Sequence, residues 1–334
     1  MAKYLRGKIV FLSLFFSLFC LELLSRFFYN PFQVAEFVSF RVGEEAQSYQ
    51  KSSIPGLAYE PVPGEGEFNS LGLRDYEKYE WHKPPGHVRI LIIGDSITFG
   101  TGVPKEFTYA KFLERLLNRN GQRFEVLNGG VEGYNTVQEI AWFFHHLYKL
   151  EPDVVIVGYC LNDRGFHIPK FHRKGKVAEI IFYSYNYPYV FPLPGNGFFL
   201  THLRSYALFQ SALSGLFMKV KKSKHVKRYV PQESSKPMEE ALVKLRNYCD
   251  EKGIKLFVII FPYFQSWKNY FLWPEHQWIK QVLKSLKIPY FDLYHTYCFF
   301  PPKWLCRDKI HPSVFGHYLA ALAIYEVFFR EVEK

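Results

Sequence analysis

Two segments, far apart in the chain, carry residue types that together could do acyl-transfer chemistry. Ser96 follows Gly94 and Asp95 where a short apolar run ends. A turn there would expose the serine hydroxyl and place its N–H at the start of a helix. Near the other terminus Asp308 precedes His311 by three residues, so a carboxylate could hold one imidazole nitrogen while the other faces the serine. A serine beside a base that an acid orients is an activated nucleophile.

Two further segments could stabilise the negative charge that such chemistry produces. Residues 128–135 contain three glycines, and at Gly133 a backbone N–H could approach a ligand with no Cβ in the way. Asn162, followed by Asp163, lies after another apolar run, and its amide could point at a developing oxyanion. Each has an ordinary alternative, since 128–135 could be a plain turn and Asn162 a helix cap or loop residue.

Taken one at a time, these residues are weak signals. Serine is a common helix cap, and His311 is one of 12 histidines. His317 is a rival base, but the last predicted helix begins near residue 312 and would contain it, either packed or facing solvent. Asp163 is expected to cap or brace the loop of Asn162, without a chemical role.

The elements that must position these residues alternate along the chain. Apolar runs predict strands at 88–93, 124–127, 153–159, 254–261 and 289–293. Helical spacing predicts helices at 105–119, 136–148, 237–251, 275–286 and 312–332. Strands that alternate with helices predict a three-layer α/β/α sandwich with a central parallel sheet of about five strands. Ligands bind beyond the carboxyl ends of such strands, where the polar residues above are expected.

In this order and placement the residues resemble the conserved blocks of the SGNH (GDSL-like) hydrolase superfamily, which run Gly-Asp-Ser, Gly, Gly-x-Asn-Asp and Asp-x-x-His. Gly94-Asp95-Ser96 matches the first block and Gly133 the second. Asn162-Asp163 matches the third and Asp308-x-x-His311 the fourth. One departure is Gly158, which lies further from the asparagine than the family's usual glycine. The resemblance covers residues 88–330.

The resemblance implies a flavodoxin-like sheet and a role for each matched residue. Ser96 would attack an ester carbonyl, His311 would take and return its proton, and Asp308 would orient the imidazole. The oxyanion would lie among the N–H groups of Ser96 and Gly133 and the amide of Asn162. This mechanism requires no metal and no organic cofactor.

The N-terminus predicts a membrane anchor. Residues 9–21 carry no charged side chain and are apolar except for two serines, and apolar character continues to Phe28. A span of about 20 residues therefore includes Glu22 and Arg26, which can pair at i, i+4. Basic residues at positions 3, 6 and 8 favour a cytoplasmic N-terminus, and no small-x-small cleavage site follows. We expect a single-pass signal anchor with the catalytic domain on the extracytoplasmic side; the alternative is a buried hydrophobic hairpin.

The formal net charge of +11 is partly local. Six basic residues at positions 219–228 follow a stretch with apolar periodicity at 206–217. This pattern is typical of a basic amphipathic helix that suits an anionic membrane surface or polysaccharide, although a solvated loop after a packed helix is the alternative. No nucleic-acid motif accompanies the charge. The five cysteines have no metal-ligand spacing, and Cys298 and Cys306 could form a disulfide or stay free thiols.

We therefore expect an anchor at 1–30, a stem and edge segment at 31–86 with a short hairpin near 67–73, and a hydrolase domain at 87–334. An insertion at 164–235 would lie over the carboxyl edge of the sheet. The predicted function is a serine ester hydrolase acting on acyl esters, O-acetyl groups among them, of an envelope carbohydrate or lipid. Two alternatives stay open: an acyltransferase with the same triad, and a non-catalytic glycan-binding protein on the same fold.

Overall fold

The structure is a computed structural model. It describes residues 2–28, 33–42, 47–164, 168–186, 193–195, 199, 202–217, 226–230, 235–270 and 272–329.

The domain is built around a five-stranded parallel sheet with the strand order β11-β10-β6-β4-β5. Its strands are β4 (Val88–Gly94), β5 (Phe124–Gly130), β6 (Val154–Cys160), β10 (Lys255–Phe261) and β11 (Tyr290–Asp292). β5 and β6 are buried along their whole length, which explains why their sequences are apolar runs and do not alternate. β4 lies between β5 and β6, so the strand order reverses there, and ligand sites form at such a point.

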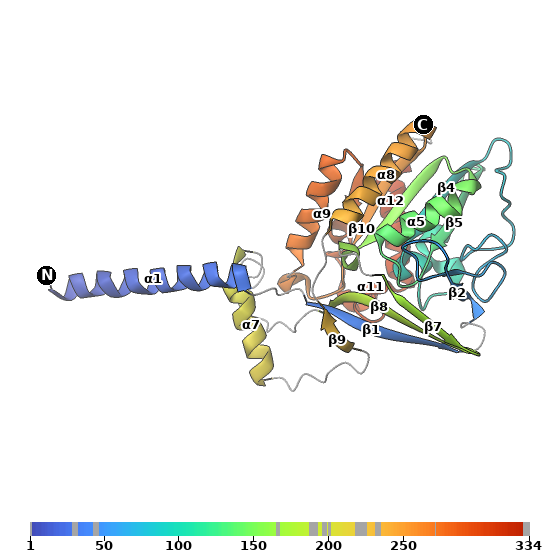
Figure 1. The fold of residues 1–334 in the computed structure, drawn as a ribbon. Helices are drawn as coiled ribbons and strands as arrows, with labels where there is room; N and C mark the ends of the chain where they lie inside the picture. The colour runs from blue at the N-terminus through green and yellow to red at the C-terminus, as the bar shows by residue number, and fades with distance from the viewer. Residues whose placement is uncertain are drawn as a thin grey trace.

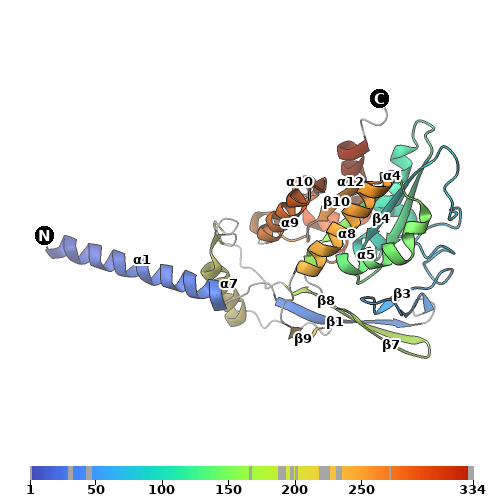
Figure 2. The ribbon, with the colours of Figure 1, turned by 45° about the horizontal axis from the view of Figure 1, so that its top comes forward.

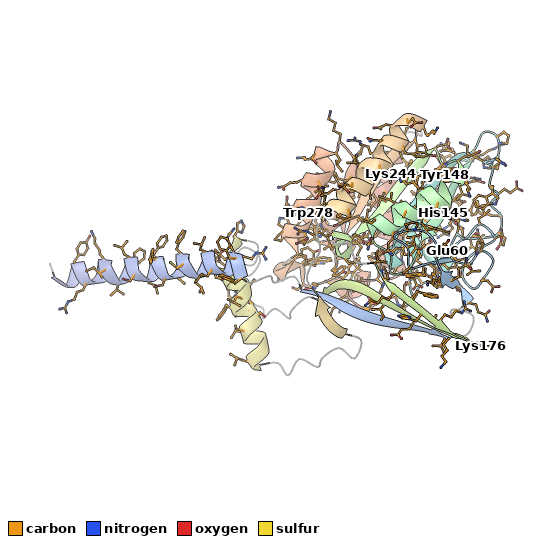
Figure 3. The ribbon with its side chains drawn as sticks, viewed as in Figure 1. Glu60, His145, Tyr148, Lys176, Lys244 and Trp278 are labelled. Carbon is orange, nitrogen blue, oxygen red and sulfur yellow. The ribbon has the colours of Figure 1, made fainter. Side chains whose placement is uncertain are left out.

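Helices cover both faces of this sheet (Figures 1 and 2). α5 (Thr136–His145) and α8 (Lys236–Lys252) contact each other on one face, while α4 (Tyr109–Leu117) and α12 (Val314–Ile324) contact each other on the other. α9 (Trp273–Ser285) lies beside α8. Lys244 of α8, labelled in Figure 3, lies 4.2 Å from the centroid of the Phe144 ring of α5. The predicted α/β/α arrangement with five strands is confirmed.

The segment before β4 wraps around the edge strand β5. The Arg74 N–H donates to the Asn128 carbonyl at 3.1 Å, and the Asp75 carboxylate accepts from the Asn128 N–H at 3.0 Å. The predicted hairpin near 67–73 is wrong, because the Asn69 side chain accepts hydrogen bonds from Leu71 and Leu73 and holds a turn. The hairpin lies earlier, where β2 (Tyr49–Lys51) pairs with β3 (Tyr59–Pro61).

A buried lysine ties this edge segment to the domain. The Lys111 ammonium group of α4 lies 2.9 Å from Asp75 and 2.9 Å from Glu114, and it donates to the Tyr79 hydroxyl at 2.6 Å. The side chains of Lys111 and Asp75 are 3% and 0% exposed. Two buried carboxylates therefore share one buried cation. Loss of Lys111 would leave Asp75 uncompensated, whereas Glu114 would keep its 3.1 Å pair with Lys78.

A second, antiparallel sheet lies across one end of the domain (Figure 1). Its strand order is β7-β8-β1-β9, with β1 (Gln33–Val42), β7 (Lys170–Lys174), β8 (Val177–Asn186) and β9 (Val226–Val230). β1 pairs with β8 from Gln33↔Asn186 to Val42↔Val177. The expectation for 31–86 is a stem with a single short hairpin, whereas the structure places a ten-residue strand there. The expected insertion at 164–235 supplies the other three strands.

This accessory sheet lies at the carboxyl edge of the parallel sheet. β8 contacts the 3-10 turn Leu161–Arg164, which follows β6. The Phe171 ring of β7 lies 5.9 Å, centroid to centroid, from the Tyr59 ring of β3. These contacts place the accessory sheet beside the turn that carries Asn162.

The N-terminal helix α1 (Ala2–Phe28) projects away from the domain (Figures 1 and 3). Residues 6–28 are long and apolar enough to cross a membrane, and the most apolar window of this span is not buried by the rest of the chain. The predicted amphipathic helix forms α7 (Arg204–Phe217), which contacts α1. The basic residues at 219–224 lie outside the described residues.

We predict that Lys111→Met lowers the free energy of unfolding by about 3–5 kcal/mol, because it leaves the fully buried Asp75 without its cation. Urea denaturation followed by tryptophan fluorescence measures the change. The matched control is Lys236→Met, which breaks the exposed Lys236–Glu240 pair and should cost less than about 1 kcal/mol. Equal losses in the two variants would contradict a structural role for the buried network.

Candidate active site

Ser96 is the first residue of the short helix α3 (Ser96–Phe99), directly after β4. Asp95 is the N-cap of this helix, and its carboxylate accepts a hydrogen bond from the Ile97 N–H at 2.8 Å. The turn is tight because Gly94 and Gly158, on neighbouring strands, leave room for the Thr98 side chain, which a Cβ at either position would meet. Gly158 therefore has a packing role at the strand ends.

His311 lies in the loop between α11 (Pro302–Leu305) and α12. The Asp308 carboxylate accepts hydrogen bonds from the N–H groups of Ile310 at 3.1 Å and His311 at 2.8 Å, which close the loop on itself. The Lys309 carbonyl accepts a hydrogen bond from the Phe264 N–H at 2.7 Å, so the loop after β10 also holds the His311 loop in place. These contacts fix the ring of His311 relative to the end of β4.

The structure brings Ser96, His311 and Asp308 into one hydrogen-bonded chain. The Ser96 Oγ lies 2.9 Å from His311 Nε2, and His311 Nδ1 lies 2.7 Å from Asp308 Oδ2. Ser96 and His311 are 215 positions apart, so only the fold creates this contact. With Nδ1–H donated to Asp308, Nε2 is left as the acceptor for the serine proton.

The charges around His311 favour its protonated form. Burial lowers the pKa of His311, but its hydrogen bond to Asp308 and the negative charges of Asp308, Asp95 and Glu132 raise it above the ordinary value. Burial raises the pKa of Asp308, but hydrogen bonds from the His311 ring and from two backbone N–H groups lower it to about 2. Asp308 is therefore ionised at neutral pH, as an orienting acid must be.

Backbone donors lie beside the serine. Gly133 has a positive φ of 77°, which glycine adopts without strain, in the turn after β5. Within the described chain, neither the Ser96 N–H nor the Gly133 N–H donates a hydrogen bond to another protein group. Two N–H groups without protein acceptors are available to a bound anion.

The Asn162 side chain lies in the 3-10 turn after β6 and donates a hydrogen bond to Asp95. An amide nitrogen carries two N–H donors, so one remains for a ligand. Burial raises the pKa of Asp95 to about 6, against the hydrogen bonds that it receives from Ile97, Asn162 and Cys160. Asp95 therefore joins the turn of Ser96 to the turn of Asn162, a role that sequence reasoning missed although the residue lies within the Gly-Asp-Ser block.

Asp163 braces the Asn162 turn, as its position predicts. Its buried carboxylate accepts hydrogen bonds from the Cys160 N–H at 3.0 Å and the Thr136 hydroxyl at 3.2 Å. Burial raises the pKa of Asp163 well above its ordinary value, and so does the charge of Asp95. The next residue, Arg164, pairs with Glu275 at 2.6 Å and lies over the Trp278 ring of α9, labelled in Figure 3, which holds the far end of the turn.

Glu132 and His317 take no part in the Ser96–His311–Asp308 chain. Glu132, before Gly133, accepts hydrogen bonds from the Thr101 hydroxyl at 2.6 Å and the Tyr49 hydroxyl at 3.2 Å; sequence reasoning gave it no role. His317 is buried in α12 against the Tyr109 ring and accepts the Tyr109 N–H at 3.2 Å. Burial lowers the pKa of His317 to about 3, so it is a neutral core residue.

The described residues include no group of three or more His, Cys, Asp or Glu side chains that could hold a metal ion. All five cysteines are free thiols, so Cys298 and Cys306 are not joined by a disulfide in this structure.

Comparison with known proteins identifies the family of this chain. The model of the GDSL-like lipase/acylhydrolase family matches residues 92–319. An arylesterase from Vibrio mimicus is 32% identical over 80 residues, which are 23% of this chain and 40% of that protein. The chain thus spans well under two thirds of that relative's length.

Solved structures of similar fold share little sequence with the chain. TesA has a TM-score of 0.46 and 12% identity, covering 72% of this chain and 98% of its own. Axe2, an acetylxylan esterase from Geobacillus stearothermophilus, has a TM-score of 0.43 and 16% identity, covering 72% of this chain and 93% of its own. Because the family model spans more than half of the chain, the protein belongs to the GDSL-like lipase/acylhydrolase family.

Proposed function

We propose that this protein is a membrane-anchored serine ester hydrolase, with Ser96 as nucleophile, His311 as general base and Asp308 as the acid that orients it. The observation that carries the proposal is the hydrogen-bonded chain from Ser96 Oγ through His311 to Asp308, with distances of 2.9 and 2.7 Å. Membership of the acylhydrolase family supports the same chemistry.

In the first half of the reaction, Ser96 Oγ attacks the carbonyl carbon of the ester while His311 Nε2 takes the serine proton. The carbonyl oxygen becomes an oxyanion, which the N–H groups of Ser96 and Gly133 and the amide of Asn162 would stabilise. One such donor contributes about 3–4 kcal/mol to the transition state. The C–O bond to the alcohol then breaks, and His311 returns the proton to the leaving oxygen, which leaves an acyl group on Ser96.

In the second half, a water molecule attacks the acyl carbon and His311 takes its proton. The tetrahedral intermediate collapses, the bond to Ser96 Oγ breaks, and His311 returns the proton to the serine. The products are a carboxylic acid and the free enzyme. Asp308 stays ionised throughout and stabilises the imidazolium that forms in each half.

We further propose that the substrate is an acyl ester, O-acetyl groups among the candidates, on a carbohydrate or lipid of the cell envelope. This proposal rests on α1, which is long and apolar enough to hold the domain at a membrane. The basic residues at positions 3, 6 and 8 favour a cytoplasmic N-terminus and an extracytoplasmic catalytic domain.

An active-site probe tests the nucleophile. A fluorophosphonate should label the full-length protein in mild detergent, and Ser96→Ala and His311→Ala should both abolish labelling, since the serine is nucleophilic only with its base. Both variants should also lower kcat/KM on short acyl esters by about 10⁴-fold or more. Matched controls are Ser285→Ala and His295→Ala, two exposed positions whose changes should leave labelling intact. Absence of labelling in a folded parent protein would overturn the proposal.

The pH dependence tests the role of Asp308. His311 accepts a proton only when neutral, so kcat/KM should fall as pH drops through the His311 pKa, and the raised pKa places this midpoint above the ordinary 6.5. Asp308→Asn removes the nearest negative charge, so the midpoint should move to lower pH while the plateau rate also falls. Asp250→Asn, an exposed change on α8, should alter neither. An unmoved midpoint in Asp308→Asn would contradict the assignment.

Membrane topology tests the anchor. We expect the full chain to stay in the membrane fraction after alkaline carbonate extraction, and an alkaline phosphatase fused to its C-terminus to be active, because that reporter folds only outside the cytoplasm. Deletion of residues 2–28 should abolish both results. Release by carbonate, or an inactive fusion in an intact full-length protein, would reject the proposed anchoring.

A further inference from the structure

The end of α1 is joined to the start of α7 by a partly buried polar contact. The Glu22 carboxylate accepts hydrogen bonds from the Arg204 N–H at 3.1 Å, the Ser205 N–H at 2.9 Å and the Ser205 hydroxyl at 2.7 Å. These are the N–H groups that a helix leaves unpaired at its N-terminus, so Glu22 acts as a cap supplied by another helix. Arg26 adds a 2.8 Å bond to Glu22 and a 3.1 Å bond to the His202 carbonyl.

This contact sets the direction of α7. In both Figure 1 and Figure 2, α7 crosses the domain-side end of α1 and does not run alongside it. If α1 crosses a bilayer, a helix that crosses its end lies near the membrane plane. The candidate span begins at Arg6, and Arg6 to Arg26 covers about 30 Å at 1.5 Å per residue. That length matches the thickness of the hydrocarbon core, so Arg26, which bonds Glu22 and the His202 carbonyl, and the start of α7 lie near the outer boundary of the bilayer.

The outward face of α7 is apolar. Phe209 and Leu216 are 49% and 78% exposed, and Ala212 between them is also exposed. Spacings of three and four residues place these side chains on one side of the helix. Ala207 and Gln210 are buried. A helix on a water-facing surface has the opposite pattern, with its apolar face buried and its polar face outward.

Charge follows the apolar face in the sequence. The chain continues from α7 into six basic residues at positions 219–228. An apolar helix face followed by a basic segment is the composition of helices that lie in the interface of an anionic bilayer. An exposed apolar face beside a membrane-spanning helix fits contact with lipid better than contact with polysaccharide or water, because only lipid removes that face from water.

We propose that α7 is an interfacial helix, which inserts Phe209, Ala212 and Leu216 among the acyl chains of the outer leaflet. The inference rests on the proposed anchoring by α1 and adds a second membrane contact. α1 leads into β1 and α7 leads toward β9, and these strands are paired at Val34↔Val230. The two helices proposed to contact the membrane are therefore both followed by strands of the accessory sheet. Strand β8 of this sheet contacts the turn that carries Asn162. Together they hold the active-site edge at a set height above the lipid.

Site-specific crosslinking to lipid tests the proposal. The photoreactive residue benzoylphenylalanine replaces Phe209 or Leu216 in the full chain, reconstituted in vesicles of phosphatidylcholine and phosphatidylglycerol with alkyne-tagged acyl chains. Phe16 on α1 is the positive control and exposed Glu251 on α8 the negative control. Because the replaced side chains are exposed, melting temperatures should match the parent. We expect lipid adducts at Phe16, Phe209 and Leu216 at least about tenfold above Glu251.

The controls separate the two proposals. Adducts at Phe16 with only background at Phe209 and Leu216 would overturn the interfacial helix and leave the anchor intact. Background at Phe16 as well would overturn the anchor, and the further inference with it. Crosslinks from Leu216 to a second copy of the chain would also overturn the proposal, because a protein would then cover the face.

Discussion

The close approach of α3 to the ends of three neighbouring strands is the constraint on which the rest of the site depends. Gly94, Gly130 and Gly158 end or nearly end β4, β5 and β6, and a Cβ on any of them would collide with Thr98 or Phe99. Because α3 packs directly against these strand ends, Ser96 Oγ comes within 2.9 Å of His311 Nε2. Arg74 holds α3 from outside, donating to the Phe99 carbonyl at 2.6 Å and the Val103 carbonyl at 2.8 Å.

This packing also buries a cluster of acidic side chains near Ser96. Asp95, Glu139 and Asp163 are buried beside one another at the end of the sheet, and the mutual repulsion of their charges adds to burial in raising the pKa of Glu139 well above its ordinary value. A protonated carboxyl group can be buried at a much lower cost than a carboxylate. One member of this cluster acts on the base directly, because the negative charge of Asp95 helps to raise the pKa of His311.

The accessory sheet connects the candidate site to the N-terminal helix. Its strand β1 follows α1 along the chain and pairs with β8, which contacts the Asn162 turn. Arg173 of β7 donates to the Tyr49 carbonyl at 3.1 Å and links the sheet to the β2–β3 hairpin, where the Tyr49 hydroxyl bonds Glu132. The path from α1 to the candidate site therefore runs through one set of strands.

Sequence alone determined the central sheet, its helices, the family and the candidate residues, because these depend on local patterns: apolar runs for buried strands, helical periodicity, and short blocks at strand ends. It missed β1, β7, β8 and β9, since β1 pairs with a segment more than 130 positions away and no local signal marks that pairing. It favoured His311 over His317 only because the last predicted helix would contain His317. Tertiary structure decided this, by burying His317 against Tyr109 and placing His311 between Ser96 and Asp308, because which side chains meet depends on how the elements pack.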